Sequence, residues 1–175
     1  MRRALTLLLT SALLGTAISV VPASPAAAAS PLTLTTGFYV DPNSSPATWA
    51  RNNPSDARAA RIQASIGSKS MSRWFGNWNT NISADVSAYV AAADAVDKLP
   101  ILTAYNIPGR DACGGQSGGG AGTPAAYQTW IAAFATAIGT RPAVVIIEPD
   151  GLGDFNCMTT AQITSRNSML VYATN

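Results

Sequence analysis

Short apolar runs alternate with longer stretches of mixed polarity along the chain. Runs typical of strands lie at residues 37–40, 72–75, 100–105 and 143–147. The last of these (AVVII) is apolar throughout, as in a strand that is buried on both faces of a parallel sheet. In the intervening stretches apolar residues recur every three or four positions, which is the spacing of a helix that buries one face. The pattern therefore predicts the order β-α-β-α-β-α-β-α.

Residues with capping side chains mark where the helices are expected to begin: Ser45, Ser55, Ser83, Thr123 and Thr160. Pro46 and Pro124 follow two of these caps, and proline is favoured at the first helical position. The helix after Thr123 has the clearest apolar face, made by Tyr127, Trp130, Ile131, Phe134 and Ile138. We interpret the aromatic residues of this face as core rather than as a ligand platform.

Strands separated by helices favour an α/β fold with a parallel sheet and crossover helices. Two architectures fit four such strands. One is a small doubly wound domain, and the other is the first half of a (β/α) barrel. A complete barrel needs about 250 residues, and the chain has 175.

The N-terminal segment, residues 1–29, is typical of a secretory signal peptide. Arg2 and Arg3 precede an apolar stretch, and small residues end at Ala29, where we place the cleavage. A membrane anchor is the alternative, but six serine, threonine and glycine residues dilute the apolar stretch. The remaining segment, residues 30–175, has the length of one domain. We expect a secreted protein that has no membrane contact after signal cleavage.

The composition excludes several classes of function. The chain has no histidine, so neither a Ser-His-Asp site nor a histidine metal site can form, and no metal or cofactor is expected. Its eleven basic and nine acidic residues balance once Arg2 and Arg3 are removed. A neutral surface with two lysines does not suit nucleic acid. Acid–base chemistry then depends on the carboxylates, of which only one is Glu.

Cys113 and Cys157 are the only cysteines. In an exported protein a single pair favours a disulfide, and two buried free thiols are the alternative.

Acidic residues follow the two most apolar strands. Asp111 comes after 100–105, and Glu148 and Asp150 come after 143–147. Functional groups of parallel α/β folds gather at these strand ends. Purely structural roles are the alternative, with Asp150 in a turn and Asp111 paired with a nearby arginine. Two carboxylates facing one cleft are the minimal set for cleaving a glycosidic bond.

A glycine-rich loop, residues 107–123, follows the first of these strands. It lacks the GxxxxGK[ST] phosphate-binding pattern. We interpret it as an active-site lid.

Two long motifs carry a resemblance to a known family. Residues 105–113 (YNIPGRDAC) with the glycine loop, and residues 145–150 (VIIEPD), resemble the two signatures of glycoside hydrolase family 6. Further blocks in the same order resemble the N-terminal part of that family, at 38–42, 49–54 and 73–76. The resemblance therefore runs across residues 30–175, as part of a catalytic domain.

This family consists of secreted cellulases, endoglucanases and cellobiohydrolases, that cleave β-1,4-glucan with inversion on a distorted (β/α) barrel. The resemblance implies that Asp150 is the general acid and that Asp111 assists it. It also implies that Tyr105 lies under the sugar at the cleavage point and that Trp74 stacks on a sugar on the non-reducing side. The two cysteines match a disulfide of the family.

The chain departs from the family pattern in two places. Ala112 separates Asp111 from Cys113, where the commonest motif is Arg-Asp-Cys. Counted from Asp111, Ser117 is the water-binding serine of the family, whereas counted from Cys113 that position falls on Gly118; we favour Ser117. The family also continues beyond the position of Asn175, where its catalytic base is expected, so we interpret the chain as the truncated first half of the barrel.

The resemblance leads to one main hypothesis and two alternatives. The main hypothesis is a secreted β-1,4-glucanase whose partner is cellulose and which is a monomer when complete. A truncated, inactive fragment with at most weak glucan binding is the first alternative. A secreted structural or adhesive domain is the second, but it does not account for the paired motifs.

Overall fold

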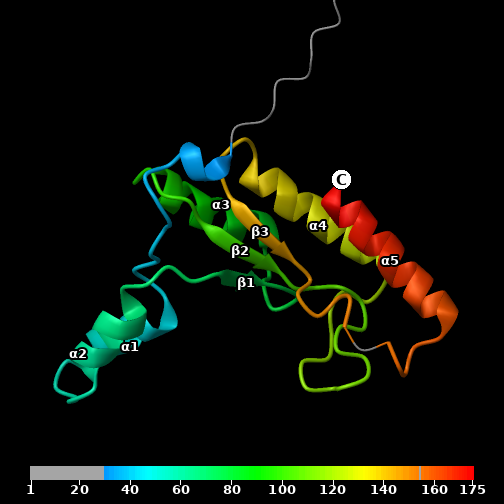
Figure 1. Ribbon diagram of the computed structural model, residues 1–175, viewed down its shortest axis with the longest axis horizontal. Helices are drawn as coiled ribbons and strands as arrows, with labels where there is room; N and C mark the ends of the chain where they lie inside the picture. Colours follow the sequence, from blue (N-terminus) through cyan, green and yellow to red (C-terminus); the bar gives the residue numbers. More distant parts are fainter. Residues whose placement is uncertain (1–29, 154) are drawn as a thin grey trace, which may run out of the picture.

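The computed structural model describes residues 30–153 and 155–175, so the predicted signal peptide lies outside the described residues. Its centre is a parallel sheet (Figure 1). The strands lie in the order β1 (Arg73–Phe75), β2 (Ile101–Ala104) and β3 (Val144–Ile147). Both outer strands run parallel to β2. The expectation of a parallel α/β fold is confirmed.

Helices connect the strands, as the apolar spacing predicts. The chain forms α3 (Ile82–Asp94) between β1 and β2, α4 (Pro124–Ile138) between β2 and β3, and α5 (Thr160–Thr174) after β3. No helix in the described ranges is long and apolar enough to cross a membrane.

Side-chain caps fix the beginnings of these helices. Thr123 accepts a hydrogen bond from the backbone N–H of Ala126 at the start of α4, as expected from the sequence. A reciprocal capping box begins α5, where Thr159 and Gln162 satisfy each other's backbone N–H groups. The expected cap of α3 at Ser83 is wrong, because Asn81 accepts from the N–H of Ala84 instead.

The end of α3 is marked by a left-handed residue. Asp97, with a φ of 54°, follows the last turn of the helix. Its carbonyl accepts hydrogen bonds from the backbone N–H and the hydroxyl of Thr36. This conformation turns the chain from α3 toward β2.

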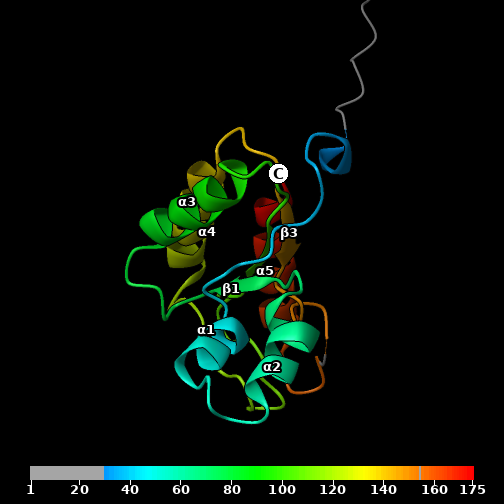
Figure 2. The same cartoon turned by 90° about the vertical axis from the view of Figure 1, so that its left-hand side faces the viewer.

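Helices α3 and α4 cover one face of the sheet (Figure 2). Side chains at alternate strand positions, including Phe75 and Leu102, point to this face and are fully buried. The ring of Phe75 packs edge-to-face against Tyr89 of α3 at 6.0 Å and Phe134 of α4 at 5.7 Å. The aromatic residues of α4 are therefore core, as expected.

The opposite face of the sheet is open. Trp74, Thr103 and Ile146 are paired across the three strands and so share this face. The Ile146 side chain is 41% exposed and that of Trp74 is 47% exposed. The expectation that 143–147 is buried on both faces is therefore wrong, because helices pack on only one side of β3.

The first predicted strand, residues 37–40, is also wrong. It is reduced to a single parallel bridge between Phe38 and Leu99. Beyond that bridge, the same edge of β2 pairs with β1, beginning at Arg73 and Leu102. Residues 37–40 therefore have only the start of the edge on which to pair.

Two short helices form a unit at one end of the molecule, far from α5 (Figure 1). They are α1 (Ser45–Asn52) and α2 (Ala59–Ile62), with α2 continued by η2 (Gln63–Gly67). A further turn, η1 (Pro31–Thr33), precedes them. The second helix begins at Ala59 rather than at Ser55, because residues 53–58 form a turn.

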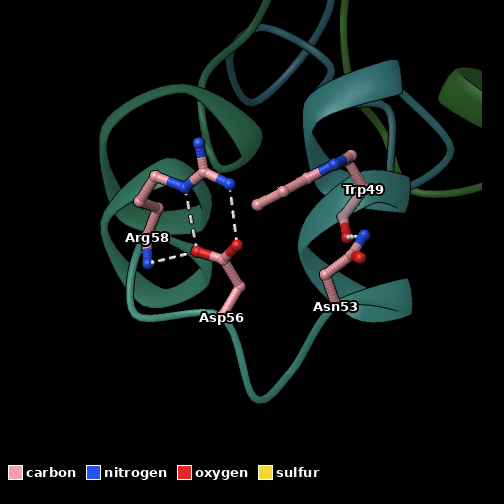
Figure 3. Close-up of polar contacts among 4 residues, drawn as sticks. All are labelled: Trp49, Asn53, Asp56 and Arg58. Atoms are coloured by element: carbon pink, nitrogen blue, oxygen red, sulfur yellow. Dashed lines mark hydrogen bonds and ion pairs between the residues drawn. The ribbon is translucent and has the colours of Figure 1, made fainter.

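That turn is fixed by an exposed ion pair (Figure 3). Asp56 accepts hydrogen bonds from the guanidinium and the backbone N–H of Arg58, which lower the pKa of Asp56 to about 2. The same guanidinium lies 5.4 Å from the centre of the Trp49 ring. Exposed pairs of this kind contribute little to stability, so their main effect here is to shape the turn.

We predict that the open face makes the chain self-associate. The exposed side chains of Trp74 and Ile146, which flank the buried Thr103, and the outer edge of β3, which pairs with no other described strand, favour contact between copies. Ile146→Lys should lower the associated fraction, because a lysine on this face opposes close packing of two sheets. Sedimentation velocity at rising concentration measures the effect.

Ile66→Lys is the matched control, since Ile66 is 47% exposed but lies in η2, away from the sheet. Equal association of the wild type and both variants would contradict the prediction.

Candidate active site

The loops that follow β2 and β3 lie side by side at the carboxyl ends of the strands (Figure 1). Each strand continues its ladder by one residue before the loop begins. The N–H of Tyr105 donates to the carbonyl of Phe75 at 2.9 Å, and that of Glu148 donates to Ala104 at 2.8 Å. The sheet therefore places Tyr105 and Glu148 on adjacent strand ends.

A chain of hydrogen bonds joins the two predicted carboxylates. The hydroxyl of Tyr105 donates to Oδ2 of Asp150 at 2.5 Å and lies 2.7 Å from Oγ of Ser117. The backbone N–H of Ser117 donates to Oδ2 of Asp111 at 2.7 Å. Burial, followed by the hydrogen bond to Asp150, raises the pKa of Tyr105, so its hydroxyl remains a donor.

Trp74 completes this group from the open face of the sheet. Its indole meets the Tyr105 ring edge-to-face at 5.1 Å and remains about half exposed. The structure thus brings together the five side chains that the sequence singles out for catalysis and substrate binding. Between Ser117 and Gly118, the geometry favours Ser117, because its hydroxyl lies beside both Tyr105 and Asp111.

Arg110 has a central place that the sequence analysis missed. Its buried guanidinium donates to the carbonyls of Ser117 and Tyr105 and to the side chain of Asn77. It also lies 4.7 Å from the centre of the Tyr105 ring. The described residues include no ion pair between Asp111 and an arginine, so the alternative of a purely structural pairing for Asp111 is not supported. The position of Arg110 beside Asp111 in the motif is the only sequence signal.

Glu148 is the second residue that the sequence analysis left without a role. Only 3% exposed, it accepts the backbone N–H of Asn106 through both carboxylate oxygens, at 2.8 and 3.0 Å. Burial raises the pKa of Glu148, against the opposing effect of these hydrogen bonds. Glu148 therefore clamps the end of β2 to the end of β3 beneath the two catalytic candidates.

The glycine loop is tied at its base. Gly109 and Ala121 donate to the carbonyls of Gly119 and Asn106, at 3.1 and 2.8 Å. At Gly120, with a φ of 97°, a Cβ would lie 2.0 Å from the carbonyl oxygen of Ile107, so only glycine fits there.

A disulfide between Cys113 and Cys157 joins this loop to the segment that follows Asp150. The expected pairing is confirmed. The loops that carry the two aspartates are thus held together both by Glu148 and by a covalent bond.

Two of the acidic residues that follow the strands, Asp111 and Glu148, have a left-handed backbone conformation. Asp111 has a φ of 50° and Glu148 a φ of 45°, values that non-glycine residues adopt at a cost. At Asp111 the conformation directs the carboxylate toward the N–H of Ser117. In the described ranges no group of three or more His, Cys, Asp or Glu side chains could hold a metal ion.

We predict that the Ser117 amide reports the titration of Asp111. Hydrogen bonds from backbone N–H groups, first that of Ser117, lower the pKa of Asp111 below 3.8. Because the folded-state pKa is depressed, this contact stabilises the loop above the unfolded pKa. The contribution is lost as the pH falls through the folded value.

The Ser117 amide NMR signal should therefore shift with a midpoint below pH 3.8, and Asp111→Asn should abolish that shift. A midpoint above the ordinary value would contradict the assignment.

A parallel α/β fold with paired acids at neighbouring strand ends has the design of barrel enzymes whose chemistry lies at the carboxyl ends of their strands. Comparison with known protein families identifies the family. The sequence profile described as "Glycosyl hydrolases family 6" matches residues 34–174, and the chain belongs to this family.

Several relatives are named endoglucanases. Endoglucanase 1 of Streptomyces halstedii is 55% identical over 165 residues, which are 94% of this chain and 51% of the relative. Endoglucanase A of Thermobispora bispora is 46% identical over 71% of this chain and 28% of its own length.

Among solved structures, the endoglucanase Cel6 of Mycobacterium tuberculosis superimposes with a TM-score of 0.73 at 36% identity. It was solved in complex with methyl-cellobiosyl-4-deoxy-4-thio-β-D-cellobioside, and the match covers 83% of this chain and 48% of that structure. The chain therefore spans about half the length of the Streptomyces halstedii relative and of the Mycobacterium tuberculosis structure, and a smaller part of the Thermobispora bispora relative.

Proposed function

We propose that the chain forms the acid-bearing part of an exported β-1,4-glucanase that cleaves cellulose with inversion. The hydrogen-bond chain from Asp150 through Tyr105 and Ser117 to Asp111, beside the exposed ring of Trp74, is the observation that carries the proposal. The ligand of the Mycobacterium tuberculosis relative, a thio-linked cello-oligosaccharide, supports β-1,4-glucan as the substrate.

In this mechanism Asp150 donates its proton to the oxygen of the leaving sugar. The hydrogen bond from Tyr105 occupies Oδ2, which leaves Oδ1 to carry that proton. Asp111 remains anionic, because backbone N–H groups hold its pKa low, and it supports the positive charge that develops on the sugar ring. Ser117, whose hydroxyl lies 2.7 Å from that of Tyr105, orients the attacking water. The proton that this water loses as it bonds to the sugar carbon passes to a base in the part of the catalytic domain that this chain does not span. Trp74 stacks on a neighbouring sugar.

Export is part of the same proposal. The basic and apolar pattern of residues 1–29 and the disulfide between Cys113 and Cys157 both suit an oxidising compartment. Mass analysis of culture medium from cells that express the gene would test it, with a mature N-terminus at Ser30 as the expected result.

A second candidate function rests on the half-exposed ring of Trp74 beside the site, because a sugar ring can stack on it whether or not cleavage follows. In that case the chain binds glucan without cleaving it.

One experiment distinguishes the two functions. The chain itself, and a chimera in which it replaces the matching part of the Streptomyces halstedii relative, are incubated with cellopentaose while NMR follows the anomeric protons. Fresh α-anomer from both proteins supports the glucanase. Binding by the chain with turnover only in the chimera supports the second function for the chain alone. Fresh β-anomer would exclude inversion. Absence of turnover in the chimera would exclude the roles proposed for Asp150 and Asp111.

A further inference from the structure

A hollow of about 410 Å³ lies where the α1–α2 unit joins the sheet. Its walls come from two segments, residues 41 and 43–46 and residues 69 and 71–74, and from Tyr89 of α3. The two segments are the connections between the α1–α2 unit and the sheet (Figure 1). Trp74 belongs to this wall and also contacts Tyr105, so the hollow adjoins the candidate active site.

Polar groups without partners converge on this hollow. The amide of Asn43 and the ammonium of Lys69 form no hydrogen bond or ion pair with any residue that the structure describes. The guanidinium of Arg73 lies over the rings of Phe75 and Tyr89 and forms no hydrogen bond or ion pair with a described residue. Asp41 uses Oδ1 to accept the backbone N–H of Asn43 at 2.8 Å and keeps Oδ2 for a ligand. Ser44 adds a buried hydroxyl that also lacks a partner.

The chemistry of the walls selects among ligand classes. A simple anion would meet Asp41, and a simple cation would meet Lys69 and Arg73, so neither suits the site alone. A pyranose ring has an apolar face and several neutral hydroxyls, each able to donate and to accept. The half-exposed indole of Trp74, together with donors and an acceptor on the same walls, matches this combination.

We propose that this hollow binds a further glucosyl unit of β-1,4-glucan, beyond the ring that Trp74 contacts. The inference rests on the proposed function, because it extends the same substrate past Trp74. The glucan then runs from Asp150 and Tyr105 across Trp74 to the hollow where the α1–α2 unit joins the sheet. The hollow has room for a sugar ring, and the extra affinity should appear only for oligomers long enough to reach it.

Lys69→Met and Asn43→Ala test the site, because each removes hydrogen-bonding capacity from the hollow and neither touches the candidate catalytic group. Lys98→Met is the matched control, since it alters the only other lysine of the chain. Calorimetry on the full chain gives Kd for cellotetraose, cellobiose and maltotetraose. Thermal melting of each variant checks that the fold is kept.

Each hollow variant should weaken cellotetraose binding about tenfold, the effect of losing one hydrogen bond to a charged or amide donor. Cellobiose, which is long enough only for Trp74 and Tyr105, should change less than twofold. The control should match the wild type. Maltotetraose, whose α-1,4 links curve the chain, should bind at least tenfold more weakly than cellotetraose.

Any of three results would contradict the proposal for the hollow. The variants could bind cellotetraose as tightly as the wild type, or they could lose affinity for cellotetraose and cellobiose equally. The wild type could also bind maltotetraose as tightly as cellotetraose. Trp74→Ala separates this failure from failure of the proposed function. If Trp74→Ala weakens cellotetraose while the hollow variants do not, only the hollow proposal fails. If the wild type binds no β-1,4-oligomer, both fail.

Discussion

Asp150→Asn should lower the hydrolysis of β-1,4-glucan by about 100- to 10,000-fold, the usual contribution of a general acid. Asparagine has the shape of aspartate and can still accept the hydrogen bond from Tyr105, so the site should keep its geometry. What it cannot do is give a proton to the leaving oxygen. Initial rates on soluble glucan, measured in the chimera with the Streptomyces halstedii relative, provide the test.

Substrates with an activated leaving group separate a missing proton donor from a damaged site. A glycosyl fluoride or a nitrophenyl glycoside needs little protonation, so its rate should fall far less than that of the polymer. Asp111→Asn is the matched comparison, because it also replaces a carboxylate by an amide and keeps an acceptor for the Ser117 N–H. It should slow both kinds of substrate. Equal losses on both substrates for Asp150→Asn would reject its role as the acid.

Removing the disulfide should lower the free energy of unfolding by about 4 kcal/mol, the chain-entropy value for a loop of this size. Cys113 and Cys157 are 44 positions apart, so the bond restricts a large part of the unfolded chain. The double variant Cys113→Ser/Cys157→Ser should therefore unfold at a lower urea concentration than the oxidised wild type. Denaturant titration followed by tryptophan fluorescence measures the difference.

Reduction of the wild type provides the control for the serine substitutions. The reduced wild type and the double variant should unfold at similar urea concentrations, since both lack the same restraint. A midpoint that does not change on reduction, or thiols that alkylate freely in the native protein, would contradict the prediction.

The strands and helices nearest the core were predictable from the arrangement of apolar residues in the sequence. The periodic apolar face of α4 and the apolar runs that form β2 and β3 are examples. The run at 37–40 has the same local character but pairs at one residue, because β1 pairs with the same edge of β2. Which of two segments will pair with a shared strand edge cannot be predicted from the sequence of either segment alone.

The candidate site was predictable where chemistry and strand ends coincide. Asp111, Asp150 and Tyr105 follow from that rule together with the family motifs, and the structure places them in one hydrogen-bonded group. Arg110 and Glu148 were missed as functional residues because most of their partners are backbone groups. Backbone N–H and carbonyl groups are the same in nearly all residue types, so the sequence does not indicate which side chain will bind them.

Two aspartates with nearly the same backbone conformation are expected to diverge under selection for thermostability. Asp97 and Asp111 both hold a left-handed φ, at 54° and 50°, which glycine adopts without strain. Asp97 offers only its carbonyl to Thr36, so glycine can replace it and relieve the strain with no loss of function. Asp111 holds Ser117 through its carboxylate, so the same replacement would trade activity for stability. Variants recovered for heat resistance alone should therefore accumulate Gly at 97, whereas variants that must also turn over glucan should retain Asp at 111.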